Sequence, residues 1–487
     1  MTFTVSDAAR VRAAASAALI EFHAPGFALG VVDSGALVFA EGFGFADIES
    51  GKPQDPNLRQ RIGSISKTMV GLCAMALVDE GRLSLDDRLI DHIPELVIDG
   101  DAEAATLRHL LTHTAGIGEV ATVKDAKASE ESLWSDAPDS DALGLFPDGL
   151  TLEVPPGTKW SYANLGFALV GEIVSRIEGA PIAQVVQRRV FGPLGMADSD
   201  LLDRPHPDLT TPYHHAVPAA ARAFNTQAGI DTPPDEATVD GTNIRGRFQY
   251  IRGGGAAGAV QSTIPDMARY ALALLDRGAG IVKPETFNAM VAPQWSPDAR
   301  MEGWGLAFQR LKHFDEDMFG HGGGVLGGWN TMLIVMPGRN QALLIHANAY
   351  FHEGFNKMVS RLIAAMLGVK ARPRAGVVSP EVLDAAPGVF EAPGGMLTNF
   401  RIIGAMGRLQ IKREGDGLKL YARRGAWKDG VAMIPDDPAD PWFFAVADDN
   451  LEPSRLALIR DATGAVTGLR CERLIEMVRT EAVAPWA

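Results

Sequence analysis

A serine and a lysine stand three residues apart at the start of an apolar segment, in the stretch RIGSISKTMV at residues 61–70. Residues three apart share one face of a helix, so the hydroxyl of Ser64 and the amine of Lys67 can come within hydrogen-bonding distance. A serine hydroxyl becomes a good nucleophile only when a base removes its proton. A lysine is such a base where burial or a nearby charge lowers its pKa from about 10.4, and apolar neighbours such as Ile65 and Met69 favour that burial.

The same spacing also suits an ordinary capping serine beside a surface lysine. Chance alone places Ser-x-x-Lys about once or twice in a chain of this length. This copy is the only one in the sequence, and it opens the apolar segment. A serine in the first turn of a helix also leaves its own backbone N–H free to bind an oxyanion. The position therefore favours a catalytic Ser64 if other catalytic elements accompany it.

A second element is Tyr162-Ala163-Asn164, in the stretch PGTKWSYANLGF. None of the other five tyrosines is followed by an asparagine at this spacing. A hydrogen-bonded tyrosine can carry the serine proton to a leaving group. The asparagine amide can orient both the lysine and a substrate carbonyl. The alternative is a tyrosine that is only buried at the start of a helix.

A third element is His321, which three glycines follow in the stretch MFGHGGGVLGGWNTMLIVMP, just before a predicted strand. Glycines let a strand backbone approach a ligand closely, as an edge strand in an active site requires. The alternative is a glycine-rich turn with a surface histidine.

Together these elements resemble the serine β-lactamase and penicillin-binding family, specifically its class C-like branch. That branch also holds D-aminopeptidases, D-Ala-D-Ala carboxypeptidases and class VIII-like carboxylesterases. The family order is Ser-x-x-Lys, Tyr-x-Asn and then Lys-Thr-Gly or His-x-Gly, and this sequence follows it. The stretches LRHLLTHTAGI, FGPLGM and STIPDMARY are similar to the family as well. The resemblance covers about residues 10–370.

The resemblance implies that Ser64 is the nucleophile and that Lys67 and Tyr162 transfer its proton. The backbone N–H groups of Ser64 and Gly324 would form the oxyanion hole. The residues that would bind the substrate are Asn164, His321 and Gly323.

No metal and no organic cofactor is expected for this chemistry. His214 and His215 are adjacent, but no carboxylate or cysteine stands at ligand spacing, which favours an exposed loop pair over a metal site. His109 and His113 lie one helical turn apart, and we expect them to be packing or helix-end residues.

His321 stands where β-lactamases carry the lysine of Lys-Thr-Gly, whose permanent charge binds the substrate carboxylate. A histidine with its ordinary pKa of about 6.5 loses its charge near pH 6–7. The sequence therefore predicts weak or no β-lactamase activity. It favours a serine hydrolase that acts through an acyl-enzyme on small amides or short peptides, including those with D-residues. A carboxylesterase with the same machinery is the first alternative, and a slowly deacylating penicillin-binding sensor is the second.

The composition sets further limits on partners and location. The chain has 487 residues, 46% of them apolar, and a formal net charge of -15, which argues against nucleic acid or an anionic membrane as a partner. We expect a small-molecule or short-peptide substrate, and the oligomeric state stays open. Neither a signal-peptide pattern nor a run of about 18 apolar residues is found, which predicts a cytoplasmic protein. The two cysteines, Cys73 and Cys471, do not indicate a disulfide framework.

Several elements must position the candidate residues. A hairpin is expected around Asp33-Ser34-Gly35, buried strands at 331–337 and 341–348, a surface insertion at 118–150 and irregular chain at 201–250. Hydrophobic periodicity predicts helices at 6–22, from Ser64 to about Gly81, and at 106–117, 164–179, 181–196 and 262–278.

The pattern changes near residue 368, where GVKARPRAGVVSPE has the composition of a linker. Beyond it, apolar and charged residues alternate in RLQIKRE and GLKLYARR, which indicates strands. We therefore predict a hydrolase domain at 1–370, a linker at 371–381 and an antiparallel β domain at 382–487. The resemblance implies an α+β fold for the first domain, with an antiparallel sheet flanked by helices beside an all-helical subdomain, and a small barrel-like fold for the second.

Overall fold

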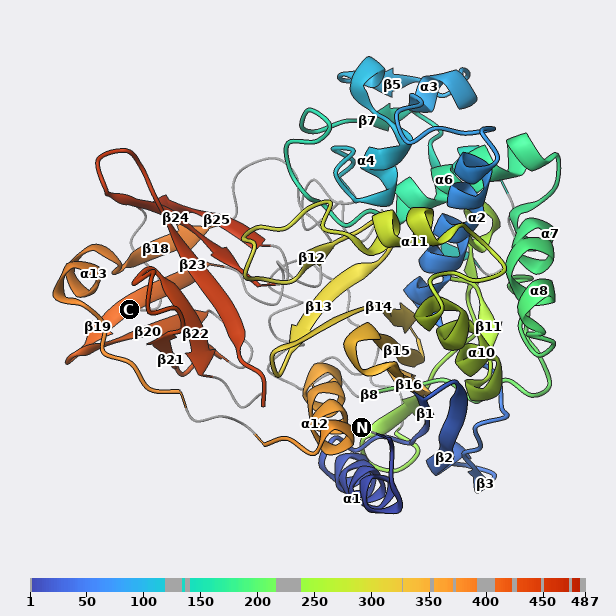
Figure 1. Ribbon diagram of the computed structural model, residues 1–487, viewed down its shortest axis with the longest axis horizontal. Coiled ribbons are helices and arrows are strands. Elements are labelled where there is room, and N and C mark those ends of the chain that lie inside the picture. The colour runs from blue at the N-terminus through green and yellow to red at the C-terminus, as the bar shows by residue number, and fades with distance from the viewer. Residues whose placement is uncertain are drawn as a thin grey trace.

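The computed structural model shows an α+β unit followed by a closed β-barrel (Figure 1). Both parts of the predicted architecture are thereby confirmed. Much of the predicted insertion at 118–150 and of the irregular stretch at 201–250 lies outside the described residues. The structure describes residues 2–118, 134–135, 141–215, 238–325, 327–350, 354–370, 374–391, 408–422, 427–447, 451–472 and 475–481.

An eight-stranded antiparallel sheet forms the frame of the α+β unit, in the order β12-β13-β14-β15-β16-β1-β2-β3. Strands β1, β15 and β16 are buried along their whole length. Such strands occur where both faces of a sheet are covered. The strands are β1 (Gly26–Asp33), β2 (Ala36–Asp47), β3 (Lys52–Pro53), β12 (Gly303–Trp304), β13 (Gln309–His313), β14 (Glu316–Val325), β15 (Trp329–Met336) and β16 (Gln341–Ala347).

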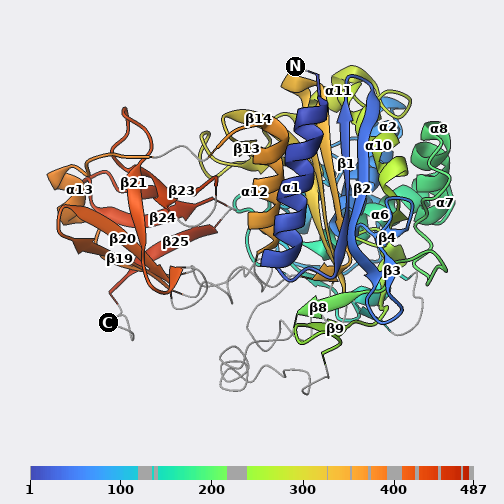
Figure 2. The ribbon, with the colours of Figure 1, turned by 90° about the horizontal axis from the view of Figure 1, so that it is seen from below.

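Helices cover both faces of this sheet (Figure 2). The pair α1 (Val5–Glu21) and α12 (Phe355–Leu367) lies side by side on one face, and α10 (Ile264–Leu275) packs on the other. Successive strand residues point to opposite faces, so Val31 joins the core under α1 and α12 while Val32 joins the core on the α10 side.

Local sequence signals account for several boundaries. The hydroxyl of Thr4 accepts from the Asp7 N–H at 3.2 Å, which begins α1 with a capping box. Ser34 and Gly35 adopt left-handed φ angles of 49° and 85°, as the tight turn between β1 and β2 requires. Thr263 caps α10 in the same manner as Thr4 caps α1.

A helical subdomain packs beside the sheet. It contains α2 (Ser66–Asp79), α3 (Leu89–His92), α4 (Leu107–Leu111), α6 (Asn164–Glu178), α7 (Ile182–Val186) and α8 (Gly192–Leu194), and α11 (Pro284–Val291) lies near α2 (Figure 1). The stretch 106–117, predicted to be a helix that ends in a glycine loop, contains only the short helix α4. The helix ends at Leu111 with Thr112 as its C-cap, and His113 then has a left-handed φ of 58°.

Short strand pairs complete the α+β unit. They are β4 (Gln60–Arg61) with β11 (Gln261–Ser262), β5 (Ile98–Asp99) with β7 (Leu150–Thr151), β6 (Trp134–Ser135) with β10 (Tyr250–Ile251), and β8 (Tyr213–His215) with β9 (Asn243–Arg245) and β17 (Ala349–Tyr350).

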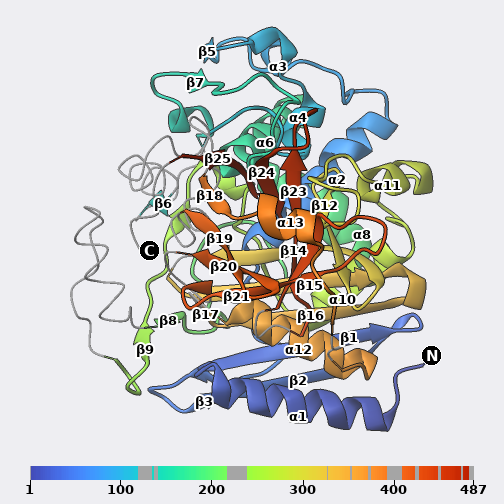
Figure 3. The same ribbon diagram turned by 90° about the vertical axis from the view of Figure 1, so that its left-hand side faces the viewer.

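The C-terminal unit is a closed antiparallel barrel of eight strands, preceded by α13 (Pro380–Ala385) (Figure 3). Apolar side chains, among them Phe390, Leu420, Phe444 and Leu469, form its buried core. Side chains of this size fill the interior of an eight-stranded barrel. The strands are β18 (Gly388–Glu391), β19 (Leu409–Glu414), β20 (Gly417–Ala422), β21 (Val431–Pro435), β22 (Phe443–Ala447), β23 (Ser454–Arg460), β24 (Val466–Cys471) and β25 (Ile475–Thr480).

Two further properties follow from the described residues. Cys73 and Cys471 are both buried free thiols. Within the described ranges, no helix has the length and hydropathy needed to cross a bilayer.

The predicted domain limits remain a prediction, and limited proteolysis tests them. Helix α12 ends at Leu367, and Val378 already packs into the barrel core, so the connection between the units lies between these residues. Lys370 is exposed within it. We expect brief trypsin treatment to cut after Lys370 and to release fragments that mass spectrometry assigns to the two units. Cleavage confined to 118–150 or 201–250 would show that the boundary is misplaced.

Candidate active site

The turn that carries Ser64 joins β4 to α2 through a short 3-10 helix, Gly63–Ile65. Gly63 has a left-handed φ of 54°, and a Cβ at this position would lie 2.8 Å from the Gly324 nitrogen. Both facts require glycine. The hydroxyl of Ser66 fixes the turn, because it donates to the Gly63 carbonyl at 2.6 Å and accepts from the Val260 N–H at 3.1 Å.

Lys67 lies in the first turn of α2 and is fully buried. Its Nζ contacts three oxygen atoms, namely Ser64 Oγ at 3.0 Å, Asn164 Oδ1 at 2.7 Å and the Ala257 carbonyl at 2.6 Å. A buried lysine amine needs such partners, because leaving its N–H groups unpaired is costly. The structure thus brings the predicted serine, lysine and asparagine into one hydrogen-bonded set. Ala257 is a member of this set that the sequence analysis missed.

Tyr162 and Asn164 occupy the start of α6, whose first residue is Asn164. The Lys67 Nζ lies 5.1 Å from the centre of the Tyr162 ring. Tyr162 is buried and packs with Trp160 and Trp304. The predicted proton-transfer pair is therefore adjacent in space. The rings of Trp160, Trp295 and Trp304 form an aromatic wall on one side of the tyrosine.

His113 holds this tyrosine in place from both sides. Its carbonyl accepts from the Ser161 N–H at 2.8 Å, and its Nδ1 accepts from the Ala163 N–H at 3.2 Å. Its ring lies 4.3 Å from the ring of Tyr162, centre to centre. Burial, followed by the charge of Lys67, keeps the pKa of His113 well below its ordinary value, so the ring stays neutral and can accept. The sequence predicts a packing or helix-end residue at position 113, and His113 does lie just beyond the end of α4. Its hydrogen bonds to Ser161 and Ala163 have no signal in the sequence.

His321 lies on β14, and its ring centre is 6.1 Å from that of Tyr162. Burial and the charge of Lys67 lower the pKa of His321 to about 3. The expectation that His321 titrates near pH 6–7 is therefore wrong. Its Nδ1 donates to the Gly322 carbonyl at 2.6 Å, so the neutral ring presents a bare Nε2. This Nε2 is buried and has no hydrogen-bond partner among the described residues.

The glycines after His321 let β14 approach the nucleophile turn. Strand β13 pairs with β14 only as far as Gly320, and the edge beyond that residue lies beside Gly63–Ile65. A Cβ at Gly323 would come within 1.9 Å of the Ile62 carbonyl. The backbone of Gly324 thus lies next to that of the nucleophile turn, as an oxyanion hole shared with Ser64 would need. The catalytic and binding roles of all these residues remain predictions.

The expectation that His214 and His215 form an exposed loop pair is wrong. Both are half-buried residues of strand β8. In the part of the chain that the structure describes, no group of three histidine, cysteine or acidic side chains is placed to hold a metal ion.

Comparisons with known proteins identify relatives of the chain as a whole. The chain is 30% identical over 239 residues to the esterase EstB of Burkholderia gladioli, which covers 47% of this chain and 60% of the esterase. It is 26% identical over 392 residues to a D-aminopeptidase of Gluconobacter oxydans, which covers 78% of this chain and 66% of the peptidase. The chain thus spans about two thirds or less of the length of these relatives.

Solved structures that span both units match the chain as well. The octameric penicillin-binding protein homologue from Pyrococcus abyssi superposes with a TM-score of 0.61 over 97% of this chain and 100% of its own, at 20% identity. That likeness shows the fold. The family model described as Beta-lactamase matches residues 11–366, a range that contains every candidate site residue, and the chain therefore belongs to the β-lactamase family.

Proposed function

We propose that this protein is a serine hydrolase that acts through an acyl-enzyme on small amides or short peptides, including those with D-residues. The observation that carries the proposal is the hydrogen-bonded set of Ser64, Lys67 and Asn164 with Tyr162 beside it. The Gluconobacter relative, a D-aminopeptidase by name, supports the substrate class.

In the proposed reaction, Ser64 Oγ attacks the substrate carbonyl while its proton passes to the Lys67–Tyr162 pair. The backbone N–H groups of Ser64 and Gly324 stabilise the resulting oxyanion. Tyr162 returns the proton to the departing amine, and the acyl group stays on Ser64. Water then attacks the ester and regenerates the serine.

His321 supports substrates that lack a free carboxylate. A carboxylate accepts hydrogen bonds and prefers a positive charge. The bare Nε2 of a neutral His321 supplies neither a donor nor a charge. It can accept from an N–H or ammonium group, which an amide or an amino-terminal residue provides.

A carboxylesterase is the second candidate, and one observation favours it. The relative with the highest identity among those compared above is the esterase EstB. An ester uses the same nucleophile and proton path, and its alcohol leaves more readily than an amine.

Substitution of Ser64 tests the proposed function directly. We expect Ser64→Ala to lower turnover of p-nitroanilides and p-nitrophenyl esters of D- and L-amino acids by about 10⁴-fold or more, because the nucleophile is removed. Covalent labelling by a fluorophosphonate probe, measured by intact-protein mass spectrometry, should also disappear. Ser175→Ala is the control, since that hydroxyl bonds to the Gly171 carbonyl inside α6. Labelling that survives Ser64→Ala would place the nucleophile at another residue. Acyl adducts of the wild-type protein with these substrates that persist for hours would favour the slowly deacylating penicillin-binding sensor.

A matched pair of substrates tests the role of His321. We expect kcat/KM for a D-alanyl dipeptide amide to exceed that for the free acid by about tenfold or more. The reason is that a neutral His321 offers the carboxylate of the free acid no positive charge and no hydrogen-bond donor. With a His321 pKa of about 3, the preference should stay constant from pH 5.5 to 9. A preference for the free acid, or a preference that changes near pH 6.5, would contradict the assignment.

Two variants of His113 test its hold on Tyr162. His113→Leu keeps bulk but leaves the Ala163 N–H unpaired, so we expect kcat to fall about 10- to 100-fold with KM nearly unchanged. His113→Asn tolerates the left-handed backbone and places an acceptor near the former Nδ1, and it should retain most of the activity. Thermal unfolding of both variants controls for stability. Equal losses of kcat in His113→Leu and His113→Asn would show that packing of the His113 ring, and not the hydrogen bond that its Nδ1 accepts, positions Tyr162.

A further inference from the structure

The segment Trp295–Trp304 forms the outer part of the aromatic wall behind Tyr162. Its two ends pair with each other, since the Trp304 N–H donates to the Trp295 carbonyl at 2.7 Å and the Trp295 N–H donates to that of Trp304 at 3.1 Å. The ring centre of Trp304 lies 5.7 Å from that of Tyr162 and 5.4 Å from that of His321. The ring of Trp295 stacks on Trp160 at 5.8 Å.

The middle of the same segment is bound to the C-terminal barrel. Arg300 contacts the carboxylates of Asp437 at 2.7 Å and Asp440 at 2.9 Å, and its guanidinium lies 3.8 Å from the centre of the Phe443 ring. Met301 packs against Phe443 and Ala457. Arg300 is only one-third exposed, so this contact combines charge, cation–π interaction and apolar burial.

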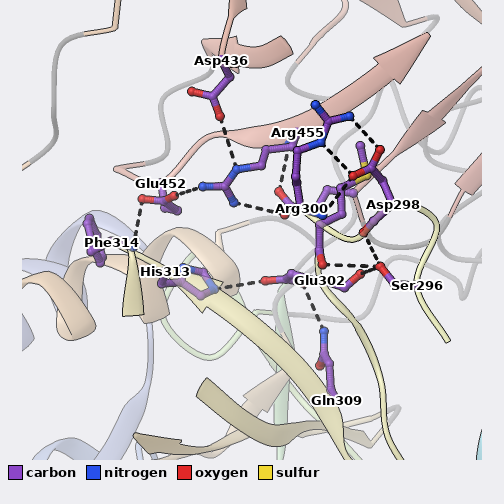
Figure 4. Close-up of polar contacts among 12 residues, drawn as sticks. Ser296, Asp298, Arg300, Glu302, Gln309, His313, Phe314, Asp436, Glu452 and Arg455 are labelled. Carbon is purple, nitrogen blue, oxygen red and sulfur yellow. Dashed lines mark hydrogen bonds and ion pairs between the residues drawn. The ribbon is translucent and has the colours of Figure 1, made fainter. Parts of the chain in front are cut away.

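A second set of contacts, which involves Glu302, His313, Phe314, Glu452 and Arg455, lies near Arg300 (Figure 4). Glu302, the residue two positions after Arg300, pairs with His313 of β13 at 3.3 Å. The N–H of Phe314 donates to Glu452 of the barrel at 3.2 Å, and Glu452 binds Arg455 at 2.8 Å. Burial, together with the charge of Glu302, raises the pKa of Glu472 in the barrel to about 7. The turn after β13 is therefore also bound to the barrel, next to the contacts of Arg300 and Met301.

We propose that the C-terminal barrel positions the active site, because its hold on Arg300 and Met301 fixes the segment Trp295–Trp304 against the ring of Tyr162. Arg300 is a positioning residue in this arrangement and touches no reacting atom. The inference rests on the proposed function, since it gives the barrel an influence on proton transfer by Tyr162.

The leaving group makes this influence measurable. An amine departs only when it receives a proton, which Tyr162 supplies. A p-nitrophenolate departs as an anion and needs no proton. A displaced Tyr162 should therefore slow an amide more than a p-nitrophenyl ester of the same acyl group, whereas a loss of folded enzyme slows both equally.

The experiment compares two variants that release the segment with one that does not. Arg300→Ala removes the contact from the segment, together with the pair that Arg300 forms with Asp298. The double variant Asp437→Asn with Asp440→Asn weakens the contact from the barrel, because it removes both negative charges. Arg408→Ala is the matched control, since Arg408 pairs with Glu391 inside the barrel at 2.8 Å with similar exposure. For each protein, kcat and KM are measured with the p-nitroanilide and p-nitrophenyl ester of one amino acid, and amide hydrogen exchange of residues 295–304 is followed by mass spectrometry.

We expect the amide-to-ester ratio of kcat to fall about tenfold in both releasing variants, with KM changed less than twofold and faster exchange at residues 295–304. The control should match the wild type. An unchanged ratio, an equal loss on both substrates or unchanged exchange would each overturn the inference. A wild-type enzyme that turns over neither substrate would refute the proposed function alone, and the exchange data would still test the hold of the barrel on the segment.

Discussion

The burial of one lysine amine is the constraint on which the site depends. An amine removed from water must find partners for its N–H groups. The partners of Lys67 come from three separate parts of the chain, namely the nucleophile turn, the start of α6 and the stretch before β11. All three parts must be in place for the buried amine to be fully paired. The packing that buries α2 therefore also fixes the position of Ser64, because both depend on the contacts of Lys67.

Much of this architecture could be predicted because it rests on short-range patterns. Apolar periodicity located α1, α6, α10 and the buried strands β15 and β16, and alternation located the barrel strands β19 and β20. Spacing alone placed Ser64 and Lys67 on one helix face. The Tyr-x-Asn and His-Gly-Gly stretches were joined to them only through resemblance to a family, since no local pattern shows that residues 97 positions apart, such as Lys67 and Asn164, will meet.

The features that escaped prediction depend on long-range packing. The hold of His113 on Tyr162 needs a left-handed residue after α4, and a sequence does not display the φ angle of a histidine. The pKa of His321 depends on how deeply its ring is buried and how near Lys67 lies. The carbonyl of Ala257 has no side-chain signature at all. The contacts of Arg300 with the barrel join residues that are 137 and 140 positions apart.

The position of the barrel has a consequence for the sheet itself. The main sheet ends at β12 and β13, and β12 is only two residues long. Among the described residues, β12 therefore pairs with only Gln309 and Arg310 on the outer side of β13. The barrel lies beside this border (Figure 1). Unpaired borders of sheets act as templates for intermolecular strand addition, and a closed barrel offers no such border. The C-terminal unit thus occupies the side of the sheet at which a further strand could otherwise add to β13.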